Sequence, residues 1–170
     1  MGLILSGATP VYVMPEYSTN ADVGRRNAGD DRKAFAETPD AKAVLLVSPT
    51  YYGLCSDLQA IAEICHCHNA ALLVDEAHGS HLYFSEQLPL GALESGADAC
   101  AQSIHKTAGS FTQSSFLSLG SGRLDEARVA ANLQMVQSTS PSYLLMASLD
   151  AARRGWRCTE KSEWNALEPR

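Results

Sequence analysis

Two charged side chains, Asp75 and Lys106, follow apolar stretches of the kind that form buried strands. Residues 70–74 (Ala-Ala-Leu-Leu-Val) precede the aspartate, and residues 97–101 (Ala-Asp-Ala-Cys-Ala) precede the turn that carries the lysine. The loops that follow parallel strands leave from the same edge of a sheet, so the two side chains can face one cavity. A lysine amine becomes a covalent catalyst when it forms a Schiff base with a carbonyl group. The spacing therefore predicts a site that holds both an amine and a carboxylate.

This pair matches the chemistry of pyridoxal 5'-phosphate. The aldehyde of this cofactor forms an imine with a lysine, and a carboxylate keeps its pyridine nitrogen protonated, so that the ring can accept electrons. Ser103 and His105 lie beside Lys106 and supply a hydroxyl and an imidazole. Taken singly, an exposed lysine is usually a solvated surface group, and an aspartate after a strand is usually a cap. The combination favours the catalytic interpretation.

Apolar runs and helical patterns alternate along the chain. This alternation predicts an α/β fold with a mostly parallel central sheet and helices on both faces. From Gly155 onward no period is visible, so residues 1–154 are predicted to form one domain and residues 155–170 an irregular tail. The predicted strands cover residues 10–14, 43–47, 70–74, 97–101 and 115–119, and the predicted helices cover residues 3–8, 31–37, 56–68, 90–96, 124–137 and 141–153.

Composition narrows the class of protein. The 170 residues suffice for one domain with a core, and a net charge of -6 argues against a nucleic-acid or anionic-membrane surface. No stretch approaches the ~20 apolar residues that span a bilayer, and residues 1–7 lack the basic start of a secretory signal. A cytoplasmic protein is expected, or an organellar one whose targeting segment lies outside this chain. The five cysteines suggest no disulfide framework, and the run Cys65 to His68 lacks zinc-site spacing, so no metal is predicted.

Four motifs carry a resemblance to a known family. They are Ser-Pro-Thr-Tyr-Tyr-Gly at residues 48–53, Val-Asp-Glu-Ala-His-Gly at 74–79, Ser-Ile-His-Lys at 103–106 and Ser-Thr-Ser-Pro-Ser-Tyr at 138–143. In these motifs and their order the chain resembles the major domain of the Orn/Lys/Arg decarboxylases, pyridoxal phosphate enzymes with the aspartate-aminotransferase-like fold (fold type I). The resemblance runs from about residue 2 to about residue 154. It implies a domain truncated at both ends, without the upstream phosphate loop and ring-stacking residue and without the small C-terminal domain.

The resemblance assigns roles around the cofactor ring. Lys106 looks like the lysine of the internal aldimine, and Asp75 looks like the partner of the pyridine nitrogen. Ala77 would pack against one face of the ring. The implied activity is decarboxylation of arginine, lysine or ornithine, with the cofactor as the electron acceptor.

Further roles follow from the same resemblance. His78 would lie near the phenolic oxygen of the cofactor or near the substrate, and Ser103 and His105 would contact its phosphate. Either Lys106 or His105 would return a proton to the α-carbon. The loop of residues 138–142 resembles one that reaches the cofactor of a neighbouring subunit, which implies a homodimer with a shared active site.

Three alternatives remain open at the level of sequence. Residues 72–78 look like a Walker B strand of a DEAH-type ATPase, in which Asp75 would hold magnesium and Glu76 would position water. The Gly-x-x-x-x-Gly-Lys-Ser/Thr loop of such proteins is absent from this sequence. Another enzyme of fold type I, such as an aminotransferase, is the second alternative, and a non-catalytic remnant of the fold is the third.

Overall fold

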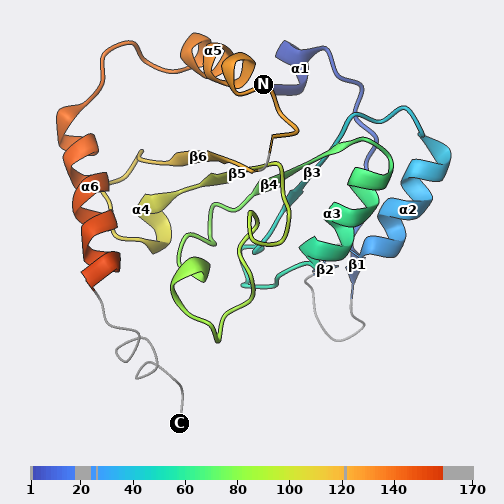
Figure 1. Cartoon of the computed structure of the whole chain (residues 1–170), viewed down its shortest axis with the longest axis horizontal. Coiled ribbons are helices and arrows are strands. Elements are labelled where there is room, and N and C mark those ends of the chain that lie inside the picture. The colour runs from blue at the N-terminus through green and yellow to red at the C-terminus, as the bar shows by residue number, and fades with distance from the viewer. Residues whose placement is uncertain (1, 18–23, 26, 121, 159–170) are drawn as a thin grey trace.

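The computed structural model describes residues 2–17, 24–25, 27–120 and 122–158, and its centre is a four-stranded sheet (Figure 1). The strand order is β3-β4-β5-β6; the first three strands are parallel, and β6 runs antiparallel to β5. This arrangement confirms the predicted α/β fold with a mostly parallel sheet. The strands are β3 (Ala43–Val47), β4 (Ala71–Asp75), β5 (Ala99–Gln102) and β6 (Phe116–Leu119), and a separate antiparallel pair is formed by β1 (Glu16–Tyr17) and β2 (Gly24–Arg25).

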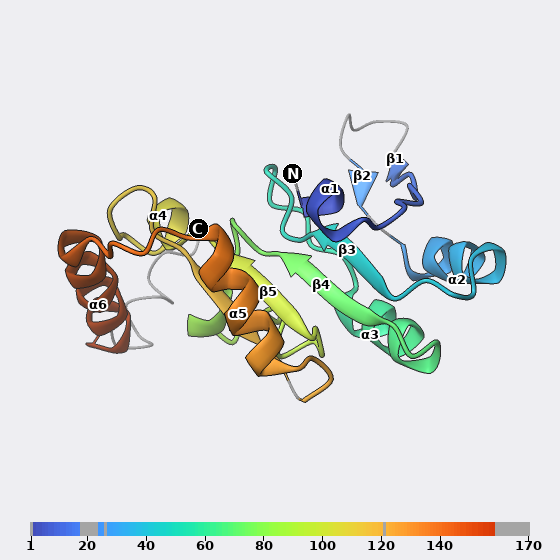
Figure 2. The ribbon, with the colours of Figure 1, turned by 90° about the horizontal axis from the view of Figure 1, so that it is seen from above.

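Helices lie around this sheet. In Figure 1, α1 and α5 are drawn above the strands, and Figure 2 places α2 and α6 at opposite ends of the molecule. Neither α1 nor α5 contains a buried residue, so the close packing comes from other helices. The helices are α1 (Gly2–Ser6), α2 (Ala28–Glu37), α3 (Leu58–Cys67), α4 (Ile104–Thr107), α5 (Glu126–Val136) and α6 (Tyr143–Cys158), with one 3-10 turn, η1 (Leu82–Phe84).

Helix α3 builds the core against one face of the sheet. It begins where the Asp57 carboxylate accepts a hydrogen bond from the Ala60 N–H at 3.2 Å, which satisfies one free donor of the first turn. Its buried stripe, which includes Ile61 and Cys65, packs against Leu72 and Val74 of β4. Burial of each such aliphatic side chain contributes about 1.5–3 kcal/mol. The core that stabilises the fold is therefore built on this face of the sheet.

The opposite face of the sheet is more open. Leu45 and Val47 of β3 are 67% and 51% exposed. Asp75 is paired in register with Val47 and with Ala101 of β5, so its side chain lies on this open face at the carboxyl end of β4. The sheet thus presents Asp75 at the edge where parallel strands place ligand-binding groups.

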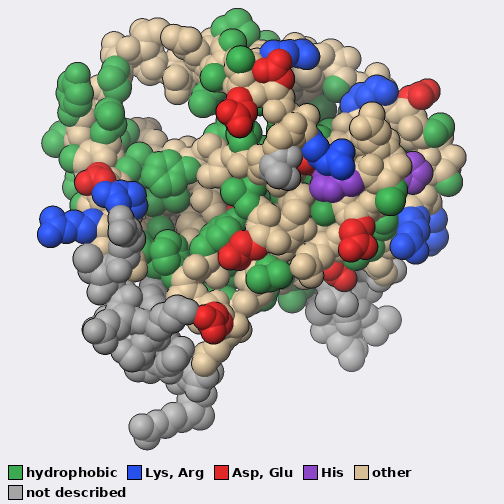
Figure 3. Space-filling view, in the orientation of Figure 1, with side chains coloured by type: hydrophobic (Ala, Val, Ile, Leu, Met, Phe, Trp, Pro, Cys, Tyr) green, Lys and Arg blue, Asp and Glu red, His purple; other side chains and the backbone are tan. Residues whose placement is uncertain are grey.

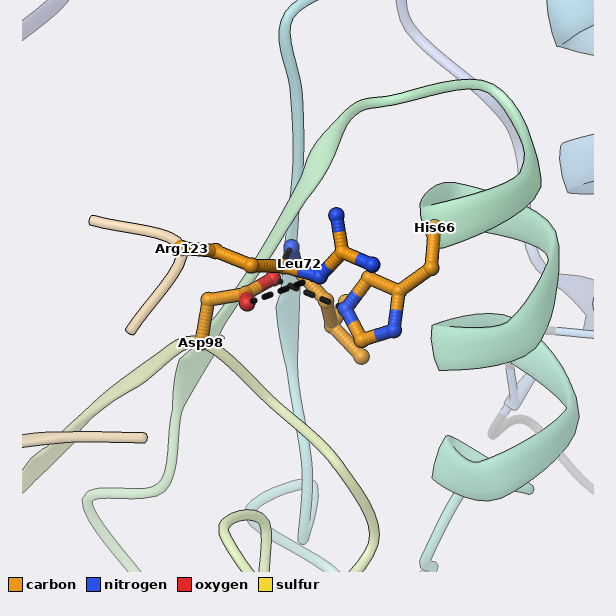
Figure 4. Close-up of polar contacts among 4 residues, drawn as sticks. All are labelled: His66, Leu72, Asp98 and Arg123. Carbon is orange, nitrogen blue, oxygen red and sulfur yellow. Dashed lines mark hydrogen bonds and ion pairs between the residues drawn. The ribbon is translucent and has the colours of Figure 1, made fainter. Parts of the chain in front are cut away.

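A buried carboxylate joins three segments at the other end of the sheet (Figure 4). Asp98 accepts hydrogen bonds from the Leu72 N–H at 2.8 Å and from Nε2 of His66 at 3.1 Å. The Arg123 Nε lies 3.7 Å from its second oxygen. Because these partners belong to β4, α3 and the segment after β6, Asp98 helps to fix the position of all three.

Three expected elements differ in the structure. Residues 10–14 form no strand; Val11, Tyr12 and Met14 are exposed. Residues 92–96 form turns instead of the helix expected at residues 90–96. The last helix continues past Arg153 to Cys158, so Gly155 to Cys158 are helical, whereas residues 159–170 of the predicted tail lie outside the described residues. Within the described ranges, no helix has both the length and the apolar character to cross a membrane.

Candidate active site

The loop after β4 begins with an exposed carboxylate. Asp75 is the last residue of β4, and its Oδ1 accepts a hydrogen bond from the Ala77 N–H at 3.1 Å. This bond curls the loop back toward the strand end, so Ala77 lies directly beside the carboxylate. His78 follows, half-buried. Asp75, Ala77 and His78 thus lie together at the carboxyl end of β4, and the cofactor contacts expected of them stay predictions.

The turn after β5 brings the lysine to this loop. Ser103 has extended backbone angles, and α4 begins at the next residue. Lys106 is exposed on α4, and its Nζ lies 3.4 Å from Nε2 of His78. Because His78 lies only three residues after Asp75, this contact joins the ends of β4 and β5. The predicted convergence of the two motifs at one sheet edge is therefore present.

His105 is tied into the protein scaffold. Its Nδ1 lies 2.8 Å from the carbonyl oxygen of Ser114, to which the ring N–H donates. In the neutral ring this leaves Nε2 as the acceptor. The hydrogen bond anchors α4 to the segment before β6. The phosphate contacts expected of His105 and Ser103 stay predictions.

Tyr51 is a neighbour of the site that the sequence analysis did not single out. Its ring meets the His78 ring edge to face, with centroids 5.5 Å apart, and meets Tyr52 at the same centroid distance. Ser48, which begins the same loop, donates its N–H to the carbonyl oxygen of Asp75 at 3.1 Å. The order of the elements could have indicated this position, because the loop that carries Tyr51 follows β3 and β3 lies next to β4. Tyr51 thus packs against the imidazole that contacts Lys106.

Glu76 points the other way and is fully buried. Its carboxylate accepts hydrogen bonds from the Tyr83 hydroxyl at 2.9 Å, the Ala92 N–H at 2.7 Å and the Gln102 amide at 2.7 Å. A carboxylate with these three donors and no exposure does not position a water molecule for ATP hydrolysis. The Glu76 role in the DEAH-type alternative is therefore excluded by the geometry.

The surroundings of Glu76 also hold two acidic groups in their neutral forms. Burial, with the nearby Glu76 charge as a smaller cause, raises the pKa of the Cys100 thiol to about 12. Burial likewise raises the pKa of the Tyr83 hydroxyl far above its usual value. Both groups therefore act as hydrogen-bonding and packing groups near neutral pH, and neither serves as a nucleophile.

The groups at this edge fit pyridoxal phosphate. Lys106 supplies an amine for the aldehyde, and Asp75 supplies an exposed carboxylate for the ring nitrogen. The Thr107 hydroxyl, next to Lys106, is buried and has no hydrogen-bond partner within the described part of the chain. Across the described residues, no cluster of three or more His, Cys, Asp or Glu side chains is arranged to hold a metal ion.

The fold of the chain is that of the fold type I pyridoxal phosphate enzymes. A solved structure of SPT with PLP superimposes with a TM-score of 0.60, covering 78% of this chain and 34% of that one at 21% sequence identity. At this identity the likeness shows the fold alone.

Sequence comparison then gives the family. The model of the Orn/Lys/Arg decarboxylase major domain matches residues 1–167, and the chain belongs to this family. The match extends beyond residue 154, where the resemblance was expected to end. An arginine decarboxylase of Bacillus subtilis is 44% identical over 89% of this chain, and lysine decarboxylase LdcA of Pseudomonas aeruginosa is 28% identical over 88%. The chain spans 31% and 23% of the lengths of these two relatives.

Proposed function

We propose that this chain is the cofactor-binding part of a pyridoxal-phosphate-dependent decarboxylase of basic amino acids. The observation that carries the proposal is the contact of 3.4 Å between Lys106 Nζ and His78 Nε2, three residues from the exposed Asp75. Membership of the decarboxylase family and relatives named for arginine and lysine decarboxylation support it. Arginine, lysine and ornithine are the candidate substrates.

Each residue has a defined part in this proposal. When bound, pyridoxal phosphate supplies an electron acceptor that stabilises the charge left as carbon dioxide departs. Asp75 holds a proton at the pyridine nitrogen through a charge-assisted hydrogen bond. Lys106 supplies the amine, and its contact with His78 gives a proton a path between the two side chains. Ala77 packs against the ring face.

The remaining assignments concern the phosphate and the partner subunit. Ser103 and His105 contact the phosphate, and His105 also holds α4 in place through its hydrogen bond to the Ser114 carbonyl. The loop of residues 138–142, between α5 and α6, reaches a second copy of the chain in a homodimer. This loop is exposed in the structure, as such a contact requires.

The test is to load the purified chain with pyridoxal phosphate and to reduce it with borohydride. A visible absorbance band and a reduced adduct on the Lys106 peptide are expected. The band and adduct should be lost in Lys106→Ala and kept in Lys42→Ala, which removes an exposed lysine elsewhere. Adducts spread equally over Lys33, Lys42 and Lys106 would overturn the assignment.

A second measurement separates catalysis from cofactor binding. Release of carbon dioxide from arginine, lysine and ornithine is followed with the loaded chain. A clear preference for one of them identifies the substrate. A specific Lys106 adduct without any release would instead favour the non-catalytic remnant, in which the fold binds the cofactor but does not turn over.

A further inference from the structure

Helix α4, which carries Lys106, is a single turn with little support of its own. Its N-cap residue, Ser103, makes no side-chain capping hydrogen bond within the described chain. The hydrogen bond that closes the turn joins the Ala108 N–H to the Ile104 carbonyl at 2.9 Å. An isolated turn of helix is unstable in water, because several residues must be fixed for each hydrogen bond gained. The position of Lys106 therefore depends on the contacts that hold this turn from outside.

Helix α6 holds the segment after the turn at two points. The Trp156 Nε1–H donates to the carbonyl oxygen of Ala108, the C-cap residue of α4, at 2.8 Å. The Ser148 hydroxyl accepts a hydrogen bond from the Phe111 N–H at 3.2 Å and donates to the Leu145 carbonyl at 2.8 Å. Figures 1 and 2 both draw α6 beside α4. These two hydrogen bonds thus join a distant helix to the backbone that follows Lys106.

The rest of this segment is also shaped by contacts outside α4. The His105 ring donates to the Ser114 carbonyl, and the Ser110 and Ser114 hydroxyls are hydrogen-bonded to each other. Between them, Gln113 has a φ of 66°, a backbone conformation that residues other than glycine rarely adopt. Tertiary contacts, and not local propensity, therefore set the path of the chain from α4 to β6.

The packing between α6 and the sheet is incomplete. A cavity of about 280 Å³ lies there, with Ala152 and Trp156 of α6 on one side and Ile104 and Ala108 on the other. Trp156 also packs against Phe84 of η1, with ring centroids 4.5 Å apart. Figure 3 shows hydrophobic side chains gathered between α6, at the left, and the centre of the molecule. Because this space is not close-packed, hydrogen bonds contribute a larger share of the contact between α6 and α4.

We propose that Trp156 and Ser148 are positioning residues for Lys106. Through the backbone of residues 108–111 they hold α4 where the Lys106 amine lies beside His78. The inference rests on the proposed function for its consequence, the reaction of Lys106 with pyridoxal phosphate, but the two hydrogen bonds can be tested without cofactor. Without either bond the turn samples other positions, so the amine is correctly placed in a smaller fraction of molecules.

The first measurement is amide hydrogen exchange in the full chain without cofactor. Trp156→Phe keeps an aromatic ring against Phe84 and removes the Nε1–H donor, and Ser148→Ala removes the acceptor of the Phe111 N–H. In both variants the amides of Lys106 and Ala108 should exchange about threefold to tenfold faster, the effect of one lost hydrogen bond on local opening. The amides of α3 should be unaffected.

The second measurement is the rate at which the visible absorbance band forms after pyridoxal phosphate is added. It should fall about threefold to tenfold in Trp156→Phe and in Ser148→Ala, and it should recover in Ser148→Thr, which restores the hydroxyl. Ser6→Ala is the matched control. The Ser6 hydroxyl also accepts from a backbone N–H, that of Ala8, and donates to a carbonyl three residues earlier, but it lies on α1. Its removal should leave both measurements unchanged.

The two measurements separate failure of this inference from failure of the proposed function. Wild-type exchange at Lys106 and Ala108 in the folded variants would overturn the inference, and so would faster exchange that extends equally to α3, which marks a general loss of stability. An unchanged rate of band formation despite faster α4 exchange would also overturn it.

A wild-type chain that forms no band would overturn the proposed function. Faster exchange confined to α4 would then still support the role of α6 in holding the lysine turn. Circular dichroism establishes that each variant is folded. If Trp156→Phe does not fold, the comparison of Ser148→Ala with Ser148→Thr decides the result.

Discussion

At the scale of single residues, the proposed chemistry depends on the negative charge of Asp75. Replacement by asparagine keeps the shape but removes the charge that holds a proton on the pyridine nitrogen. A hydrogen bond to a charged group contributes about 1.5–3 kcal/mol, so the affinity of Asp75→Asn for pyridoxal phosphate should fall about 10-fold to 100-fold. Titration of the visible absorbance band measures this change.

The matched control is Asp57→Asn. Asp57 is also exposed, and it caps α3 through its side chain. Asparagine is an equally good cap, so this variant changes the charge of the chain by the same amount without loss of stability. Equal cofactor affinity in Asp75→Asn and the wild type would contradict the role of Asp75.

The Cys100 thiol should make the free energy of unfolding depend on pH in the alkaline range. Its pKa is raised from 9.0 to about 12, chiefly by burial, so the folded chain keeps a proton that the unfolded chain has lost. The free energy of unfolding should therefore fall as pH rises from about 9 to about 12, by at most about 1.4 kcal/mol per pH unit from this thiol. Urea unfolding at several pH values measures the slope. Cys100→Ala should make it shallower, with the remainder coming from Tyr83, whereas Cys67→Ala, at an exposed site, should not change it.

At the scale of elements, Glu76 connects the ends of β4 and β5. It follows Asp75 and holds Gln102, the residue before Ser103, so one buried carboxylate sets the spacing between the two halves of the candidate site. In Glu76→Gln the N–H groups of the new amide would lie opposite the groups that now donate hydrogen bonds to the carboxylate. A buried donor without an acceptor costs about 1–3 kcal/mol, and unfolding in urea should show a loss of this size.

The control for this change is Glu63→Gln, because Glu63 is exposed on α3. A change within about 0.5 kcal/mol is expected there, as for most surface substitutions. Should Glu76→Gln unfold at the same urea concentration as the wild type, the carboxylate does not hold the two strand ends together.

The elements themselves were predictable where burial and local sequence agree. The apolar runs at residues 43–47 and 70–74 became adjacent strands, and Asp57 with the stripe that follows it became α3. The run at residues 10–14 failed because a strand needs a hydrogen-bonding neighbour, which an apolar pattern does not reveal. The helix expected at residues 90–96 is replaced by turns, in which the Ser95 N–H donates to the Gly91 carbonyl and Gly96 ends the segment with a positive φ.

At the scale of the whole molecule, the site exists because three strands are parallel. The loops after β3, β4 and β5 leave the same edge, so Tyr51, His78 and Lys106 meet although they are far apart in sequence. The sequence could predict that Asp75 and Lys106 converge, because both follow strand-like runs. It could not predict the antiparallel β6 or the cavity beneath α6, since both depend on how distant segments pack.

The exposed apolar surface on the last two helices bears on assembly. Tyr143, Leu144 and Met146 are 79%, 75% and 53% exposed, and Met135 and Val136 of α5 are exposed as well. These residues flank the loop of residues 138–142, which the proposed function places at a second subunit. Exposed apolar clusters of this kind commonly mark protein interfaces.

The chain is therefore expected to self-associate through this surface, and Leu144→Glu should weaken the association. Moving a charge into an apolar contact is unfavourable, so the dissociation constant measured by sedimentation equilibrium should rise at least about 10-fold. Gln134→Glu adds the same charge at an exposed polar position of α5 and should leave the constant unchanged. A wild-type chain that sediments as a monomer at all concentrations would refute the interface, and equal weakening by both variants would show that net charge alone controls association.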